Sequence, residues 1–177
     1  IKIKKSQKFI FDFNKKEGDS SRVGLPHSFI FKKIKKNSIV LVDDGKYAFK
    51  VLRKDKKSFL TKCLSQNCYL SSNKSLHVSN ISLPFNNLTS KDKKDIKIAK
   101  KIGCNWVALS YLQDAKLIYQ TRKLISKDMG IISKIENKSA LNNINEIIHA
   151  TDAVMIARGD LAIDVGHSEV PKIQLGL

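Results

Sequence analysis

The sequence of 177 residues predicts an α/β fold in which a small all-β module precedes a region of alternating strands and helices. Two observations carry this prediction. Residues 1–82 contain short runs rich in β-branched and aromatic residues, and polar turns separate these runs. From residue 83 to residue 177, apolar strands alternate with amphipathic helices at a period near about 25 residues. Such a period indicates a parallel sheet, either open or closed into a barrel.

The all-β module is predicted from five short runs of strand-forming residues. Asp43, Asp44 and Gly45 separate the second run from the third, so these two runs are expected to form a hairpin. The five runs cover residues 9–13, 38–42, 47–52, 58–61 and 68–70.

Three apolar runs and the segments between them define the second region. The strands are expected over residues 106–109, 131–135 and 153–157, with the continuous apolar character of parallel strands buried on both faces. The first helix begins at Thr89, where Asp92 completes a capping box, and Gly103 ends it. Further helices are expected over residues 117–125 and 141–148, where apolar residues recur at helical spacing.

Composition excludes several classes of protein. No run approaches about 18 uninterrupted apolar residues, so a membrane span is not expected. The first residues lack the pattern of a signal peptide and do not begin with Met, so the start is not expected to be a native terminus. Cys63, Cys68 and Cys104 are too few and too irregular for a disulfide framework or a zinc site, and we expect reduced thiols in a cytoplasmic protein.

The net charge of +17 arises from 33 Lys and Arg against 16 Asp and Glu. The excess is almost entirely Lys, whereas recognition of base edges and bidentate binding of phosphate favour Arg. The lysines are also spread along the chain, so we favour a solvated surface over a nucleic-acid interface. A basic RNA-binding module remains the alternative from another class.

The residues with the strongest chemical character follow the predicted strands. Ser110 follows the first strand of the second region, Lys134 and Glu136 the next, and Gly159 and Asp160 the third. The carboxyl ends of parallel strands meet at one edge, where catalytic groups lie in such folds. Two carboxylates suit Mg²⁺, and an ammonium group stabilises charge on a transferring phosphoryl group or an enolate. Lys134 and Glu136 are two apart, so their side chains are expected on the same side of the strand.

These motifs resemble the pyruvate kinase family. In chain order the segments are VDDG (residues 42–45), LP with LTSKD (83–92), ALSY (108–111), IISKIEN (131–137) and VMIARGDL (154–161). The family has their counterparts in the same order, so the resemblance covers nearly the whole chain. It implies a partial (β/α)₈ TIM barrel at residues 83–177, preceded at residues 1–82 by part of a small all-β lid domain and the crossing back to the barrel.

The resemblance also implies roles for individual residues. Lys134 would stabilise the transition state as phosphoenolpyruvate passes its phosphoryl group to ADP, giving pyruvate and ATP. Glu136 and Asp160 would hold Mg²⁺, and the backbone of Gly159 and Asp160 would contact the anionic end of the substrate. Ser110 would line the floor of the site. The family also uses K⁺ and forms a tetramer, which we expect of the complete cytoplasmic protein, with no nucleic-acid or membrane partner.

Several features depart from the family. Residues 74–80 replace the segment that shapes the crossing to the barrel, Lys46 and Ser90 stand where the family has other residues, and His77 is expected to be an incidental surface residue. The resemblance places the first three barrel strands, which carry the K⁺ site, before Ile1, and the last two strands and a regulatory domain after Leu177. We therefore expect the isolated chain to be inactive. A metal-dependent barrel that handles enolates, such as a 2-keto acid aldolase or lyase, and a degenerate inactive copy remain alternatives.

Overall fold

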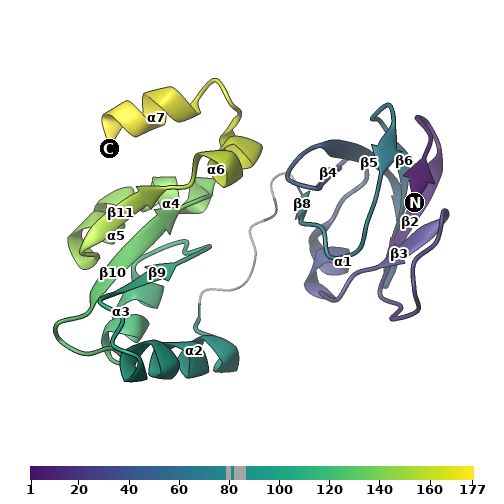
Figure 1. Cartoon of the computed structure of the whole chain (residues 1–177). Helices are drawn as coiled ribbons and strands as arrows, with labels where there is room; N and C mark the ends of the chain where they lie inside the picture. The colour runs from purple at the N-terminus through teal and green to yellow at the C-terminus, as the bar shows by residue number, and fades with distance from the viewer. Residues whose placement is uncertain (79–80, 82–86) are drawn as a thin grey trace. The chain divides into compact units, whose positions relative to one another are not determined.

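The computed structural model describes residues 1–78, 81 and 87–177, which form two compact units (Figure 1). The units comprise residues Ile1–Ser82 and Leu83–Leu177. The LP pair at positions 83 and 84 lies outside the described residues, as do positions 79 and 80 of the segment that departs from the family. No helix in the described part of the chain is long and apolar enough to cross a membrane.

The first unit is built on a sheet whose six described strands follow the order β3-β2-β6-β5-β4-β8. β2 and β3 are parallel, every other pair in this sheet is antiparallel, and β1 pairs separately with β7. The elements are β1 (Lys2–Ile3), β2 (Lys8–Asp12), β3 (Arg22–Gly24), α1 (Phe29–Lys33), β4 (Ile39–Val42), β5 (Tyr47–Lys54), β6 (Ser58–Cys63), β7 (Cys68–Tyr69) and β8 (Leu76–Val78).

The predicted hairpin is confirmed as β4 and β5, which pair from Ile39 opposite Lys50 to Val42 opposite Tyr47. Asp43 and Asp44 adopt positive φ angles of 57° and 52°, and Gly45 follows at 84°. Asp and Gly tolerate this left-handed backbone better than β-branched residues do, so the DDG turn suits a tight hairpin. The short helix α1 is a difference from the all-β expectation for residues 1–82.

Alternating burial along the strands gives the first unit one core. β2 and β6 bury every second residue, as expected for a sheet with one covered face. Phe11 is 1% exposed, and its ring lies 5.2 Å from that of Phe59 and 5.5 Å from that of Phe49. α1 adds Phe31, whose ring centroid lies 5.6 Å from that of Phe59. Burying each such side chain stabilises the unit by about 1.5–3 kcal/mol.

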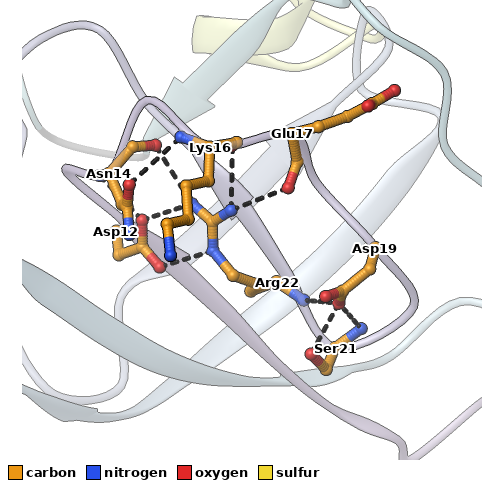
Figure 2. Close-up of polar contacts among 7 residues, drawn as sticks. All are labelled: Asp12, Asn14, Lys16, Glu17, Asp19, Ser21 and Arg22. Carbon is orange, nitrogen blue, oxygen red and sulfur yellow. Dashed lines mark hydrogen bonds and ion pairs between the residues drawn. The ribbon is translucent and has the colours of Figure 1, made fainter.

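Arg22 organises the loop between β2 and β3 (Figure 2). Its Nη2 and Nε donate to the two carboxylate oxygens of Asp12 at 2.5 and 2.7 Å. Its Nη1 donates to the backbone carbonyls of Lys16 and Glu17, both at 3.0 Å. The hydrogen bond from Arg22 holds the pKa of Asp12 below its ordinary value. One guanidinium therefore fixes both ends of this loop.

The second unit contains a parallel sheet whose three described strands follow the order β11-β10-β9 (Figure 1). The predicted alternation of strands and helices is confirmed. Its elements are α2 (Ser90–Lys101), β9 (Trp106–Leu109), α3 (Lys116–Arg122), β10 (Gly130–Ile135), α4 (Lys138–Asn142), α5 (Ile144–Ala150), β11 (Ala153–Ile156), α6 (Arg158–Val165) and α7 (Val170–Gly176).

The signals at the two ends of α2 are confirmed. The hydroxyl of Thr89 accepts from the backbone N–H of Asp92 at 3.1 Å, and the Asp92 carboxylate accepts from the N–H of Thr89 at 2.7 Å. This reciprocal arrangement is the capping box that the sequence predicts. Beyond the helix, Gly103 adopts a φ of 75°, which a residue with a Cβ rarely does.

Two predictions for this unit are wrong in detail. The single helix expected over 141–148 is divided into α4 and α5 at Asn143, whose side chain donates to the carbonyl of Gln113 at 2.9 Å. The outer strands are not buried on both faces, since Trp106 is 52% and Met155 44% exposed. Among the described residues β9 and β11 each pair only with β10, so their outer edges have no covering neighbour.

The cysteines differ sharply in environment. Cys63 and Cys68 are buried in the first unit, and Cys104 is exposed in the second. Burial, and to a smaller extent the neighbouring Cys63, raise the pKa of the Cys68 thiol to about 12. All three are free thiols, as the sequence predicts.

Candidate active site

The register of the parallel sheet brings Lys134 and Ser110 together. Ser133 of β10 lies opposite Leu109 of β9, so the next residues on each strand emerge side by side at the carboxyl edge. Lys134 Nζ donates to Ser110 Oγ at 2.9 Å. On β10, Ile131, Ser133 and Ile135 are buried, while Lys134 between them is half-buried and faces the other side.

Glu136 follows β10 directly and forms an ion pair with Lys134 through its Oε1. The two side chains lie on the same side of the strand, as their spacing predicts. The Glu136 side chain is only 1% exposed, and its Oε2 accepts the backbone N–H of Tyr111 at 2.8 Å. Tyr111 holds a φ of 56°, an uncommon conformation for a residue with a bulky side chain. Each carboxylate oxygen of this buried group therefore has a donor.

Charge at this edge of the sheet stabilises the ammonium form of Lys134. The hydrogen bond to Glu136 raises the pKa of Lys134 above its ordinary value, and partial burial opposes this change less strongly. The negative charges of Glu136 and Asp160 act in the same direction as the hydrogen bond. Lys134 is therefore a fixed positive charge at neutral pH, held between a hydroxyl and a carboxylate.

Gly159 and Asp160 lie in the first turn of α6, which starts directly after β11. The backbone N–H of Ala157 donates to the carbonyl of Ile135 at 3.1 Å, so this helix begins beside the end of β10. A Cβ at Gly159 would meet no atom within 4 Å, so the space next to this backbone is open. An acidic residue in a first turn also interacts favourably with the helix dipole.

The structure thus brings Lys134, Glu136 and Ser110 into direct contact, and Asp160 is near enough to influence the charge of Lys134. The sequence did not indicate the backbone amide of Tyr111, because no local pattern marks a positive φ at that residue type. It also predicted no helix over residues 158–165, since the glycine of the ARGD segment weakens a helical pattern.

Two carboxylates, Glu136 and Asp160, are the donors that this edge of the sheet offers to a cation. No group of three or more His, Cys, Asp and Glu that could bind a metal occurs in the described ranges. One or two carboxylates, completed by water and substrate oxygens, are the usual protein ligands of Mg²⁺. The chemistry of this donor set therefore fits Mg²⁺ better than a softer metal.

Comparison with known proteins identifies the family. The family model described as pyruvate kinase, barrel domain, matches residues 1–177. The chain is 38% identical over 175 residues to the pyruvate kinase of Buchnera aphidicola subsp. Acyrthosiphon pisum, covering 94% of this chain and 36% of that protein. It is 36% identical over 182 residues to the pyruvate kinase of Buchnera aphidicola subsp. Schizaphis graminum, covering 98% of this chain and 38% of the relative.

A third similar protein is the pyruvate kinase of Agrobacterium vitis, which is 34% identical over 149 residues, 84% of this chain and 31% of that protein. The chain therefore spans about a third of the length of the curated relatives that it matches. The family model and the relatives agree with the resemblance that the motifs indicate, and the chain belongs to the pyruvate kinase family.

Proposed function

We propose that this chain carries the cation-binding and phosphoryl-transfer groups of a pyruvate kinase, which moves a phosphoryl group from phosphoenolpyruvate to ADP and yields pyruvate and ATP. The observation that carries the proposal is the contact of Lys134 with Glu136 and Ser110 at the carboxyl edge of a parallel sheet. In this proposal residues 83–177 are the middle portion of a (β/α)₈ barrel, and residues 1–82 are part of the lid domain with the crossing to the barrel.

Lys134 is the proposed catalytic residue. Its ammonium group would stabilise the negative charge on the phosphoryl oxygens during transfer, and later the charge on the enolate oxygen. Ser110 and Glu136 hold this side chain at the carboxyl edge of the sheet before substrate binds. Its raised pKa keeps it protonated at neutral pH.

Glu136 and Asp160 would hold Mg²⁺, which polarises phosphoryl and enolate oxygens when bound. Glu136 is buried, and its Oε1 is occupied by the movable ammonium of Lys134 rather than by a fixed backbone donor. Release of Oε1 frees a carboxylate oxygen and an ammonium group together, one suited to a cation and the other to an anion. The Tyr111 amide on Oε2 keeps the carboxylate in place during this exchange.

The backbone of Gly159 and Asp160 would bind the anionic end of the substrate. The first amides of a helix have no partner within the helix, and they attract negative charge. Open space beside Gly159 leaves room for a ligand to approach them. We propose K⁺ as a second ion of the complete protein and assign no residue of this chain to it. A tetrameric, cytoplasmic complete protein belongs to the same proposal.

The test is an assay of the complete gene product for pyruvate formation that depends on ADP and Mg²⁺. Lys134→Ala is expected to lower kcat by about 10²–10³-fold or more, the usual cost of removing a group that stabilises transition-state charge. Lys127→Ala is the matched control, because Lys127 is exposed and precedes β10 at the opposite end of the strand. Equal activity of the Lys134→Ala variant and the wild type would exclude the proposed role.

A further inference from the structure

Asp164 connects the helix that carries Asp160 to the segment that carries Glu136. Its Oδ2 accepts the backbone N–H of Lys138 at 2.7 Å. Asp164 lies in the last turn of α6, and Lys138 is the first residue of α4, two residues after Glu136. The contact therefore crosses between the two elements that carry the proposed metal ligands.

Both ends of this connection are firmly held. Asn137, between Glu136 and Lys138, caps α4 by accepting the N–H of Ala140 at 2.9 Å, and its amide donates to the carbonyl of Leu112 at 3.0 Å. On α6, Leu161 and Ala162 are buried in a small apolar cluster. Asn137 therefore gives Asp164 a fixed donor at the Lys138 amide, and the bond to this donor restrains the last turn of α6.

The bond complements a second contact at the start of α6. There, the N–H of Ala157 donates to the carbonyl of Ile135 and fixes the first residues of the helix against β10. Asp164 fixes the last turn against the start of α4. Asp160 and Asp164 are four residues apart on α6, so their side chains lie one turn apart on the same face of the helix. Because Asp164 shares this face, its bond to the Lys138 amide restrains the rotation of the helix that carries Asp160.

We infer that Asp164 is a positioning residue, which holds the position of Asp160 relative to Glu136 by fixing the end of α6 to the Lys138 amide. This inference rests on the proposed function, because it takes Glu136 and Asp160 as the cation ligands. Groups that orient ligands in this way typically contribute about 10–100-fold to metal affinity.

The test measures the affinity of the complete gene product for Mn²⁺ alone, by electron paramagnetic resonance. Asp164→Ala removes the acceptor, and Lys138→Pro removes the donor. Proline is well tolerated at the first position of a helix, and Asn137 before it is already extended, with φ −148° and ψ 162°. Each variant is expected to raise the Kd for Mn²⁺ by about 10–100-fold. The double variant is expected to be no weaker than either single one, because both remove the same bond.

Two further variants separate positioning from a general loss of structure. Asp164→Asn keeps an oxygen acceptor and is expected to bind Mn²⁺ within about threefold of the wild type, since it restores the hydrogen bond. Asp128→Ala removes an exposed carboxylate before the start of β10 and is expected to leave the affinity unchanged. Circular dichroism checks the fold of each variant, and Lys138→Pro decides the result if Asp164→Ala does not fold.

Three results would overturn the inference, and they are distinguishable. If Glu136→Gln abolishes binding of Mn²⁺ but Asp164→Ala and Lys138→Pro bind it as the wild type does, the metal site stands and Asp164 does not position it. If wild type and Glu136→Gln bind Mn²⁺ equally, the metal site itself is wrong and the role of Asp164 fails with it. If Asp164→Ala loses affinity for Mn²⁺ but Lys138→Pro does not, the effect comes from the charge of Asp164 and not from its hydrogen bond to Lys138.

Discussion

The sheet of the first unit buries a cluster of phenylalanine rings against one face, whereas the outer strands of the second sheet leave large apolar side chains exposed. Phe11 and Phe59 are at most 1% exposed, but Trp106 is 52% and Met155 44% exposed. An antiparallel sheet with one polar face has only one apolar face to bury, and a short helix such as α1 helps to cover it. Parallel strands require neighbours on both sides, and the described part of the second unit offers them only to β10.

The two units also differ in net charge. Residues 1–82 carry 19 Lys and Arg against 6 Asp and Glu, and residues 83–177 carry 14 against 10. The acidic residues are concentrated in the unit that contains the proposed cation ligands. Most of the net charge of +17 therefore comes from the first unit and not from the unit that contains the proposed site.

The largest expected effect tests the closed core of the first unit. Phe11→Ala removes a ring that contacts Phe9, Phe49 and Phe59, and is expected to lower the free energy of unfolding by about 3–5 kcal/mol. Urea denaturation followed by circular dichroism measures it, and Phe11→Leu is the control with a smaller loss. A change below about 1 kcal/mol would show that the core does not stabilise this unit.

The next effect concerns the polar loop of the first unit. Arg22→Ala is expected to cost about 2–3 kcal/mol of unfolding free energy, because it leaves a partly buried carboxylate and three carbonyls without their donor. The control is Arg53→Ala, which breaks an ion pair of 3.8 Å between side chains that are 75% and 59% exposed and should cost less than about 0.5 kcal/mol. Equal losses of unfolding free energy in the two variants would show that the contacts of Arg22 stabilise the unit no more than an exposed ion pair does.

A smaller effect tests the packing at the open edge of the second unit. A Cβ at Gly130 would lie 2.3 Å from two ring carbons of Trp106, so the ring must move. Gly130→Ala is expected to cost about 1–2 kcal/mol and to change the fluorescence of Trp106, the single tryptophan of the chain. Gly103→Ala, which has open space but a φ of 75°, is the control for backbone strain and should not change the fluorescence spectrum.

The smallest expected effects concern how the stability of each unit depends on pH. Asp12 has a pKa below its ordinary value, so its contribution is present above about pH 4 and is lost as the pH falls through the folded pKa. Lys134 has a raised pKa, so its contribution is present at neutral pH and is lost as the pH rises through the folded value. Denaturation at a series of pH values should show that Asp12→Asn removes part of the acid dependence and Lys134→Met part of the alkaline dependence.

Local rules predicted the elements whose signals lie within a few residues. The β4–β5 hairpin, the cap of α2 at Thr89 and the same-side placement of Lys134 and Glu136 each follow from such spacing. The helix α1 was missed because its sequence, FIFKK, has the composition of a strand and becomes helical through burial of Ile30 and Phe31.

Contacts between distant residues could not be predicted from the sequence pattern. The bond from the Tyr111 amide to Glu136 joins residues 25 apart, and that from Lys138 to Asp164 joins residues 26 apart. They depend on the parallel register of the sheet and on the helical form of residues 158–165. The spacing of strands and helices also left an open sheet and a barrel equally possible, and only the family motifs favoured the barrel.

The unequal exposure of the cysteines has a practical consequence for spectroscopy. Cys63 and Cys68 are buried, and because the pKa of Cys68 is raised to about 12, this thiol contributes almost no thiolate at neutral pH, the form that reacts with maleimides. Cys104 precedes β9 and is exposed, so a single fluorophore or spin label can be attached there without mutagenesis. Because it stands at the amino end of the strand and Ser110 follows the carboxyl end, the label would report on the second unit without occupying the edge where the proposed site lies.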